Sequence, residues 1–255
     1  MESEIMRSTG KVFICGAGPG DPKLITVKAM EVLKNCNVVL YDRLVSKEII
    51  NQIPTTTKRV YVGKAIGDPR THQDSTNYLM VEYARKGKSV LRLKGGDPFI
   101  FGRGGEEAEY LFQHNIEFEI IPGITSAIGS AAYAGIPLTH RQFASSLAIV
   151  TGHEDPEKKE PIVKWGKLAE VVDTLVILMG IERLESISYN LIKYGMSKTT
   201  EVAIIENGTT KEQRVIKGTL SNIAKKVKET KMKPPAIIVI GRVVSLHEKL
   251  AWFNK

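Results

Sequence analysis

The chain has 255 residues, of which 42% are hydrophobic and 25% charged, as in an ordinary water-soluble globular protein. Its two cysteines are too few for a disulfide framework, and its five histidines lack metal-ligand spacing, so we expect no metal site. The first ten residues lack the apolar stretch of a signal peptide, and no apolar run approaches the roughly 20 residues that cross a membrane. These features predict a cytoplasmic protein with no membrane partner.

The formal net charge of +8 is open to three interpretations. The lysines that cluster between 225 and 233 could form a solvated helix face, steer a small acidic molecule, or bind nucleic acid. A polyanionic small molecule suits this charge as well as RNA does, and we expect no nucleic-acid partner.

Strand and helix patterns alternate through the first half of the chain. A helix is predicted to begin at Pro22, capped by Asp21, with Leu24, Val27 and Leu33 on its apolar face. Further helices are predicted at about 75–86 and 106–114, and strands at 11–15, 37–41, 59–62, 89–93 and 117–121. This alternation predicts a mainly parallel sheet covered by helices on both faces.

A second unit is predicted to begin after Pro122 and Gly123. It opens with a helix of small residues at 126–134, and its strands are predicted at 146–150, 173–179, 201–206, 214–217 and 236–240. Two of these strands lie close together around Gly208, which indicates antiparallel pairing. We therefore expect two α/β domains, 1–122 and 123–255, the first with a mainly parallel sheet and the second with a mixed sheet.

The first glycine-rich loop, GAGPGD at 16–21, stands where a dinucleotide-binding turn would stand. It departs from that pattern because Asp21 replaces the third glycine and Pro19 has no backbone N–H to donate to a phosphate. Asp21 at a helix N-terminus would also repel a phosphate there. The loop therefore argues against a nicotinamide cofactor but leaves open a tight turn beside another ligand.

The second loop, KGGDPFIFGRGGEE at 94–107, is the most informative stretch of the sequence. It follows a predicted strand, and open α/β sheets bind ligands at the carboxyl ends of their strands. Its glycines allow close approach of a ligand to the backbone, and its phenylalanines supply apolar walls. A third loop places Thr125 and Ser126 at the start of a helix, either to contact a ligand or simply to cap the helix.

These loops belong to an ordered set of motifs that extends over nearly the whole chain. The motifs are GAGPGDP (16–22), YDRLVS (41–46), VGK (62–64), RLKGGDPFIFGRGGEE (92–107), PGITSA (122–127), GIPLTHR (135–141), VTGH (150–153), MG (179–180), ENGT (206–209) and PAIIVIGRVV (235–244). With them the sequence resembles the tetrapyrrole (corrin/porphyrin) methylase family. YDRLVS, FGRGGEE and PLTHR resemble most closely the members that methylate uroporphyrinogen III.

The resemblance implies a homodimer of two-domain subunits that bind S-adenosyl-L-methionine in a cleft between the domains and release S-adenosyl-L-homocysteine. It implies methylation of uroporphyrinogen III at carbons 2 and 7, giving precorrin-2 via precorrin-1 for siroheme and cobalamin biosynthesis. It also implies the stand-alone form, without the dehydrogenase and ferrochelatase module of fused siroheme synthases. Two alternatives remain open: a methylase that acts on a later corrin intermediate or a protein side chain, and a non-catalytic ligand-binding homologue.

The resemblance also implies roles for individual residues. Asp42 is the expected proton acceptor and Lys64 the expected proton donor, although either could be an ordinary charge at a strand end. The expected cofactor-binding residues are Pro19, Gly95, Gly96, Asp97, Ile100, Thr125, Ser126, Met179, Gly208 and Ala236. The substrate carries eight carboxylates, so arginines are expected to bind it; the candidates are Arg43, Arg103 and Arg141, with Glu106 orienting an arginine or lying near a pyrrole N–H.

Overall fold

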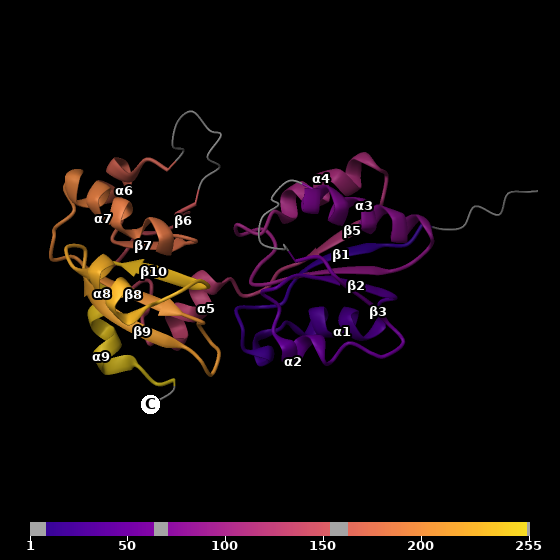
Figure 1. Ribbon diagram of the computed structural model, residues 1–255, viewed down its shortest axis with the longest axis horizontal. Coiled ribbons are helices and arrows are strands. Elements are labelled where there is room, and N and C mark those ends of the chain that lie inside the picture. Colours follow the sequence, from indigo (N-terminus) through magenta and orange to yellow (C-terminus); the bar gives the residue numbers. More distant parts are fainter. Residues whose placement is uncertain (1–8, 64–70, 154–162, 254–255) are drawn as a thin grey trace, which may run out of the picture. The chain divides into compact units, whose positions relative to one another are not determined.

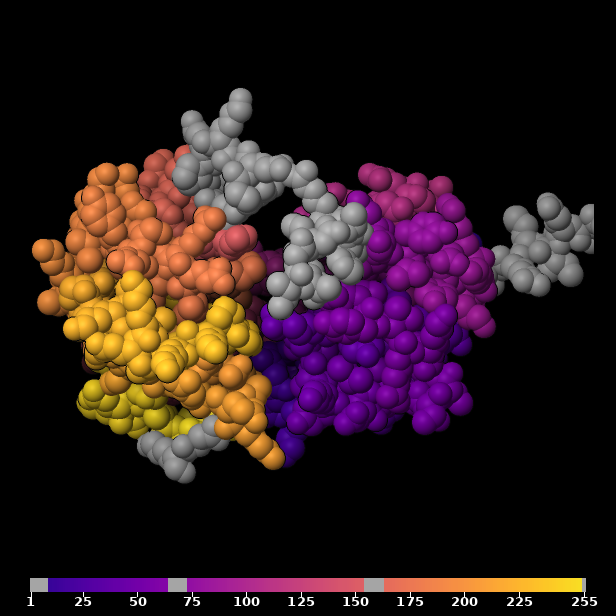
Figure 2. Space-filling model, viewed as in Figure 1, coloured from indigo at the N-terminus to yellow at the C-terminus, as the bar shows by residue number. Residues whose placement is uncertain are grey.

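The computed structural model of the protein describes residues 9–63, 71–153 and 163–253. Internal contacts divide the chain into two units, Met1–Thr125 and Ser126–Lys255. Each unit has its own β-sheet with helices on both faces (Figure 1), and on the face drawn in Figure 2 each is closely packed. The predicted boundary between 122 and 123 lies a few residues before this division.

The first unit contains a five-stranded parallel sheet in the order β3-β2-β4-β1-β5. Its strands are β1 (Val12–Gly16), β2 (Val38–Tyr41), β3 (Lys58–Tyr61), β4 (Val90–Lys94) and β5 (Phe118–Ile121). Its helices are the 3₁₀ turn η1 (Pro22–Leu24), α1 (Val27–Asn35), α2 (Lys47–Ile50), α3 (Thr71–Arg85) and α4 (Gly104–Gln113). The predicted parallel sheet is confirmed, and because all five strands run the same way, their carboxyl ends share one edge.

Side chains alternate between the two faces of this sheet, so each face has its own core. Cys15 packs on one face with α1 and α2, where Leu33 and Ile49 are buried. Ile14 packs on the other face with α3 and α4, where Met80 and Leu111 are buried. The residues of β1 and β2 are therefore apolar at consecutive positions, as expected for a sheet covered on both sides.

The predicted cap at Asp21 and start at Pro22 are confirmed for the short 3₁₀ helix η1 only, and the predicted start of the α-helix is wrong. Asp21 Oδ1 accepts a hydrogen bond from Lys23 N at 2.9 Å, which closes only the short turn η1. The chain is then extended at Ile25, and α1 begins at Val27 with Thr26 Oγ1 accepting from Ala29 N at 3.2 Å. Val27 is 77% exposed and does not belong to a buried face. Two cap residues five positions apart compete here, and the second one starts the α-helix.

The second unit contains a mixed sheet in the order β6-β7-β10-β8-β9. Its strands are β6 (Leu147–Thr151), β7 (Thr174–Leu178), β8 (Glu201–Glu206), β9 (Arg214–Thr219) and β10 (Ala236–Ile240). β6 and β7 are parallel, β10 is antiparallel to both β7 and β8, and β8 is antiparallel to β9. The predicted antiparallel pair around Gly208 is thus β8 with β9, and the predicted mixed sheet is confirmed.

Helices cover both faces of this second sheet as well. They are α5 (Ser126–Tyr133), α6 (Trp165–Val171), α7 (Leu184–Lys193), α8 (Ile223–Thr230) and α9 (His247–Leu250), with the 3₁₀ turns η2 (Ile181–Arg183) and η3 (Arg242–Leu246). α5 packs through Ala127 and Ala131 on one face, and α7 and α8 pack on the other. α6 and α7 were not predicted, although Leu184, Ile187 and Leu191 of α7 have helical spacing.

Some sequence predictions concern residues outside the described ranges. These are Lys64, most of the first ten residues, and most of the charged, proline-bounded segment at 153–161, whose sequence predicts an exposed loop. Within the ranges that are described, both cysteines are buried, and burial raises the pKa of Cys15 to about 12 and that of Cys36 to about 11. No helix in those same ranges has the length and apolar character needed to span a membrane.

Candidate functional site

Two predicted ligand loops meet at the carboxyl edge of the first sheet. β1 and β4 are parallel neighbours, so the loop that follows Gly16 lies beside the loop that follows Lys94. Gly96 N donates to Gly18 O at 2.7 Å, and Gly18 N donates to Gly96 O at 3.2 Å. Pro19, which follows this bridge, is half-buried. The structure therefore brings Pro19, Gly95 and Gly96 together, as their places in the sheet require.

The third loop packs against the other two through glycine backbone. A Cβ atom on Gly123 would lie 2.3 Å from Gly96 O, and a Cβ atom on Gly16 would lie 2.4 Å from the same oxygen. Only glycine tolerates so close an approach of three chain segments. The three motifs thus form one continuous backbone platform at the sheet edge.

Asp97 holds this platform together. Its Oδ2 accepts from Gly123 N at 3.0 Å, while its Oδ1 accepts from Phe99 N at 2.8 Å and Ile100 N at 3.1 Å. Three backbone donors on one carboxylate orient the second loop relative to the third. Asp97 therefore has a structural role that the sequence did not suggest, beside its predicted contact with a cofactor.

The second loop is strained and presents apolar side chains to solvent. Phe101 and Arg103 have φ angles of 53° and 59°, in the left-handed region that residues other than glycine rarely adopt. Phe99, Ile100 and Phe101 are 54%, 41% and 45% exposed. Strain of this kind persists where function or surrounding structure requires it, and contiguous exposed apolar groups mark binding surfaces.

Asp42 and Arg43 follow β2 at the same edge. Asp42 is 24% exposed, its Oδ1 accepts from Leu44 N at 3.0 Å, and its Oδ2 lies 3.5 Å from Arg92 Nη2. Arg43 is exposed. Both oxygens of the Asp42 carboxylate are therefore held, one by its own loop and the other by a neighbouring strand.

Arg103 and Glu106 form an exposed ion pair at the start of α4, in which Arg103 Nε donates to Glu106 Oε2. This is the contact that Glu106 would make if it orients an arginine. Because both groups remain solvent-exposed, the pair itself stabilises the fold little and leaves the guanidinium accessible to an anion.

A cluster of buried charges lies beneath this edge, and the sequence analysis missed it. Arg92 and Lys94 project from β4, and Glu107 from α4; they are 5%, 4% and 0% exposed. Glu107 Oε1 accepts from Arg92 Nε at 3.0 Å, Lys94 Nζ at 2.8 Å and Gln73 Nε2 at 3.2 Å. A signal was available, since two cations alternate with apolar residues in the strand VLRLK and so share one face.

The pKa values in this cluster reflect both burial and neighbouring charge. Desolvation, aided by Arg92, lowers the pKa of Lys94. Desolvation alone would raise the pKa of Glu107, but Arg92 and Lys94, with hydrogen bonds from Lys94 and Gln73, outweigh it and lower that pKa. Glu107 is therefore ionised at neutral pH and serves as the anion between two cations.

Thr125 and Ser126 stand where the third loop leads into α5. Thr125 is 7% exposed, and Ser126 is the first residue of the helix. Hydroxyl groups at the start of a helix lie near the N–H groups of its first turn, which suits either capping or binding.

In the second unit, three predicted cofactor-binding residues share one edge of the mixed sheet. Met179 follows the end of β7, Gly208 lies just past the end of β8, and Ala236 begins β10. The register confirms their proximity, because Leu178 pairs with Ile237, and Glu206 pairs with Ala236.

The backbone at this second edge is also strained. Met179, Asn207 and Thr209 have φ angles of 55°, 49° and 68°. Positive φ is most unusual for a β-branched residue such as Thr209. A Cβ atom on Gly208 would lie 2.0 Å from Ser130 Oγ of α5, so glycine is required there. Arg141 lies in an exposed turn of this unit, after His140.

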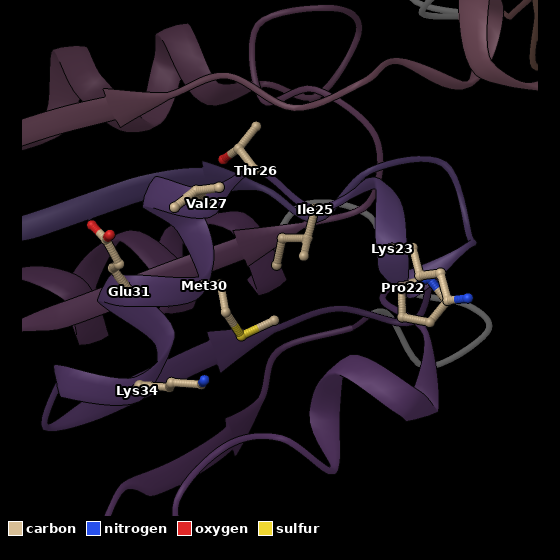
Figure 3. A pocket seen from close by; sticks show the side chains of 8 residues that line it. All are labelled: Pro22, Lys23, Ile25, Thr26, Val27, Met30, Glu31 and Lys34. Atoms are coloured by element: carbon tan, nitrogen blue, oxygen red, sulfur yellow. The ribbon is translucent and has the colours of Figure 1, made fainter.

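A separate hollow lies beside η1 and α1 of the first unit (Figure 3). It is lined by Pro22, Lys23, Ile25, Thr26, Val27, Met30, Glu31 and Lys34. None of these is a predicted site residue. The candidate site is defined by the loop platform and not by this hollow.

Comparisons with known proteins agree with the motif analysis. Residues 11–224 match the family model of Tetrapyrrole (Corrin/Porphyrin) Methylases. The S-adenosyl-L-methionine-dependent uroporphyrinogen III methyltransferase of Methanosarcina barkeri is 49% identical over 241 residues, which are 94% of each chain. A crystal structure of uroporphyrin-III C-methyl transferase from Thermus thermophilus, complexed with S-adenosylhomocysteine, is 37% identical and has a TM-score of 0.80, covering 93% of this chain and 100% of that one.

Longer relatives also match. The siroheme synthase of Nitrosomonas europaea is 49% identical over 246 residues, which are 96% of this chain but 51% of the relative. The chain thus spans about half the length of that siroheme synthase.

Proposed function

We propose, from the premise that this chain belongs to the tetrapyrrole (corrin/porphyrin) methylase family, that it transfers methyl groups from S-adenosylmethionine to uroporphyrinogen III. The observation that carries the proposal is the similarity, over 94% of both chains, to a Methanosarcina barkeri relative named for this reaction. The strained and glycine-built loops at the strand ends support it, because they provide the type of site that the reaction needs.

The residues of the first unit suit S-adenosylmethionine. The cofactor has an amino acid group, a ribose with two hydroxyls, and apolar surface along its adenine and thioether chain. The platform of Gly95, Gly96 and Asp97 offers backbone donors and acceptors to the polar groups, and the exposed side chain of Ile100 offers apolar contact. Pro19 and Thr125 flank this platform as further proposed contacts. When bound, the cofactor supplies an electrophilic methyl group on a sulfonium.

The second unit supplies the remaining proposed cofactor contacts. These are Ser126 at the start of α5, Met179 after β7, Gly208 after β8 and Ala236 at the start of β10. Met179 is 53% exposed despite its apolar side chain, which leaves it available to pack on adenine. A Cβ atom on Gly208 would lie 2.0 Å from Ser130 Oγ, so this residue would offer only backbone atoms to the cofactor.

The chain's own part in the chemistry is alignment and proton transfer. A pyrrole carbon attacks the methyl group in line, so catalysis depends chiefly on the relative placement of the two reactants. Asp42, held at both oxygens, accepts the proton that the macrocycle loses. Lys64, which follows β3 in the VGK motif, is the proposed proton donor.

Arginines bind the substrate carboxylates in this proposal. Arg43 and Arg103 are exposed at the carboxyl edge of the first sheet, and Arg141 is exposed in the second unit. A guanidinium binds a carboxylate through two parallel hydrogen bonds, which is why arginines rather than lysines are the proposed ligands of the substrate carboxylates. Glu106 orients Arg103 through the observed ion pair. We also propose that the protein works as a homodimer and methylates carbons 2 and 7 in turn, giving precorrin-2.

The proposal is tested by incubating the protein with uroporphyrinogen III and S-adenosylmethionine labelled in its methyl group. We expect two labelled methyl groups per tetrapyrrole, measured by mass spectrometry. Label in a later corrin intermediate but not in uroporphyrinogen III would place the protein at another methylation step. Binding of S-adenosylhomocysteine without any transfer would identify a non-catalytic homologue.

A further inference from the structure

The buried cluster of Arg92, Lys94 and Glu107 is not used by the chemistry proposed above. Charged side chains are almost never this fully buried unless they are paired. These three buried side chains carry two positive charges and one negative charge, so one positive charge remains unbalanced. Asp42, 3.5 Å from Arg92, is the carboxylate that brings this group of four to neutrality.

The geometry of Arg92 links Glu107 directly to Asp42. Arg92 Nε donates to Glu107, Nη1 donates to Leu93 O at 3.2 Å, and Nη2 faces Asp42 Oδ2. All three guanidinium nitrogens are therefore engaged, and the planar group has one orientation. Among the three groups that Arg92 contacts, the carboxylate of Glu107 is the one buried anion. Glu107 belongs to the helix α4, whereas Arg92 belongs to the sheet.

We propose that Glu107 is a positioning residue, which holds Arg92 in the orientation that fixes the carboxylate of Asp42 for proton transfer. The inference rests on the proposed function, because Asp42 is the proton acceptor only there. Asp42 Oδ1 is held by Leu44 N in its own loop, so Arg92 decides where the other oxygen points. Without Glu107, Arg92 would turn away from the edge and Asp42 would lose its second anchor.

The central variant is Glu107→Gln, which keeps the size and one acceptor of the side chain and removes its charge. A catalytic group displaced by about 1 Å can lose roughly 100-fold in rate. We therefore expect kcat to fall roughly 100-fold, with the KM for uroporphyrinogen III and the Kd for S-adenosylhomocysteine unchanged within about 2-fold. Glu109→Gln, which changes an exposed glutamate of the same helix, is the matched control and should leave kcat unchanged.

A double variant separates positioning from a purely structural role. If Glu107 acts through Asp42, adding Glu107→Gln to Asp42→Asn should lower kcat no further. Losses that multiply in the double variant, or a normal kcat in Glu107→Gln, would overturn the proposal. A normal kcat in Asp42→Asn would overturn it too, because no proton acceptor would then remain to be positioned.

Two further measurements cover failure to fold and failure of the proposed function. If Glu107→Gln does not fold, Arg92→Lys takes its place, because it keeps every charge but cannot bridge Glu107 and Asp42. This variant should show the same selective loss of kcat, and an unchanged kcat would refute the proposal.

If the wild-type protein does not methylate uroporphyrinogen III, the proposed function fails by itself. The positioning claim is then decided by crystal structures of the wild type and of whichever of these variants folds, in which an unmoved Asp42 carboxylate would contradict it.

Discussion

Single charged residues at the first sheet edge divide into two kinds by burial. Arg43, Arg103 and Glu106 are exposed, so they are available to a ligand and contribute little to stability. Arg92 and Glu107 are buried, and removing either would leave an uncompensated charge, which costs about 3–5 kcal/mol. Substitutions in the first group should therefore change binding, while those in the second should change stability or the placement of other groups.

At Arg103, we expect the substitution Arg103→Ala to raise the KM for uroporphyrinogen III with little change in kcat. A hydrogen bond to a charged group contributes about 1.5–3 kcal/mol, which corresponds to a rise of roughly 10- to 100-fold. Steady-state methyl transfer over a range of substrate concentrations measures both constants. Arg85→Ala, at an exposed arginine of α3, is the control. Equal KM values for the two variants would remove Arg103 from the substrate site.

The loops between strands and helices are the elements that form the site. Each follows a strand whose partners are already set by the sheet, so the order β3-β2-β4-β1-β5 determines which loops become neighbours. The loops after β1 and β4 are bridged by Gly18 and Gly96, and the loop after β5 packs on them at Gly123. A change in one loop should therefore displace the other two loops of the platform.

Gly123→Ala tests this dependence. The added methyl group would lie 2.3 Å from Gly96 O, so the third loop must move away from the second. We expect weaker binding of S-adenosylhomocysteine and a lower Tm, measured by calorimetry and thermal unfolding.

Gly105→Ala is the control for this experiment. It lies in α4 with nothing within 4 Å of the added atom, and alanine favours a helix by about 0.8–1.0 kcal/mol over glycine. Its Tm should be equal to that of the wild type or higher. If Gly123→Ala binds as tightly as this control, the platform does not depend on close glycine packing.

At the scale of the whole molecule, the net charge of +8 suits the negatively charged substrate that is proposed. The lysines of α8, such as Lys225, Lys226 and Lys228, are exposed as the solvated-face interpretation predicted. A positive protein attracts a substrate with eight carboxylates over distances comparable to the Debye length.

Salt should therefore weaken the capture of this substrate. We expect kcat/KM for uroporphyrinogen III to fall roughly 10-fold between about 0.05 and 0.5 M KCl, since screening removes long-range attraction. The Kd for S-adenosylhomocysteine, which carries no large net charge, should change by less than about 2-fold over this range and serves as the control. A kcat/KM that does not depend on salt would show that the positive charge has no part in substrate capture.

Much of the fold could be predicted because its signals are local. Apolar runs such as VVLY, bounded by polar turns, predicted the strands of both sheets, and the two strands around Gly208 predicted antiparallel pairing. The first helix was misplaced because Asp21 and Thr26 both carry cap chemistry, and only the observed hydrogen bonds decide between them. α6 and α7 were missed although the apolar spacing of α7 was present in the sequence.

By itself, therefore, the sequence determined the strands, the parallel and mixed character of the two sheets, and the family, because each depends on periodicity or on motif order along the chain. The tertiary structure alone decided which backbone segments meet at Gly96 and which charges are buried together. Glu107 follows Arg92 by 15 residues and joins it only because α4 packs on the face of β4. Such pairings depend on strand order and helix packing, which no local pattern encodes.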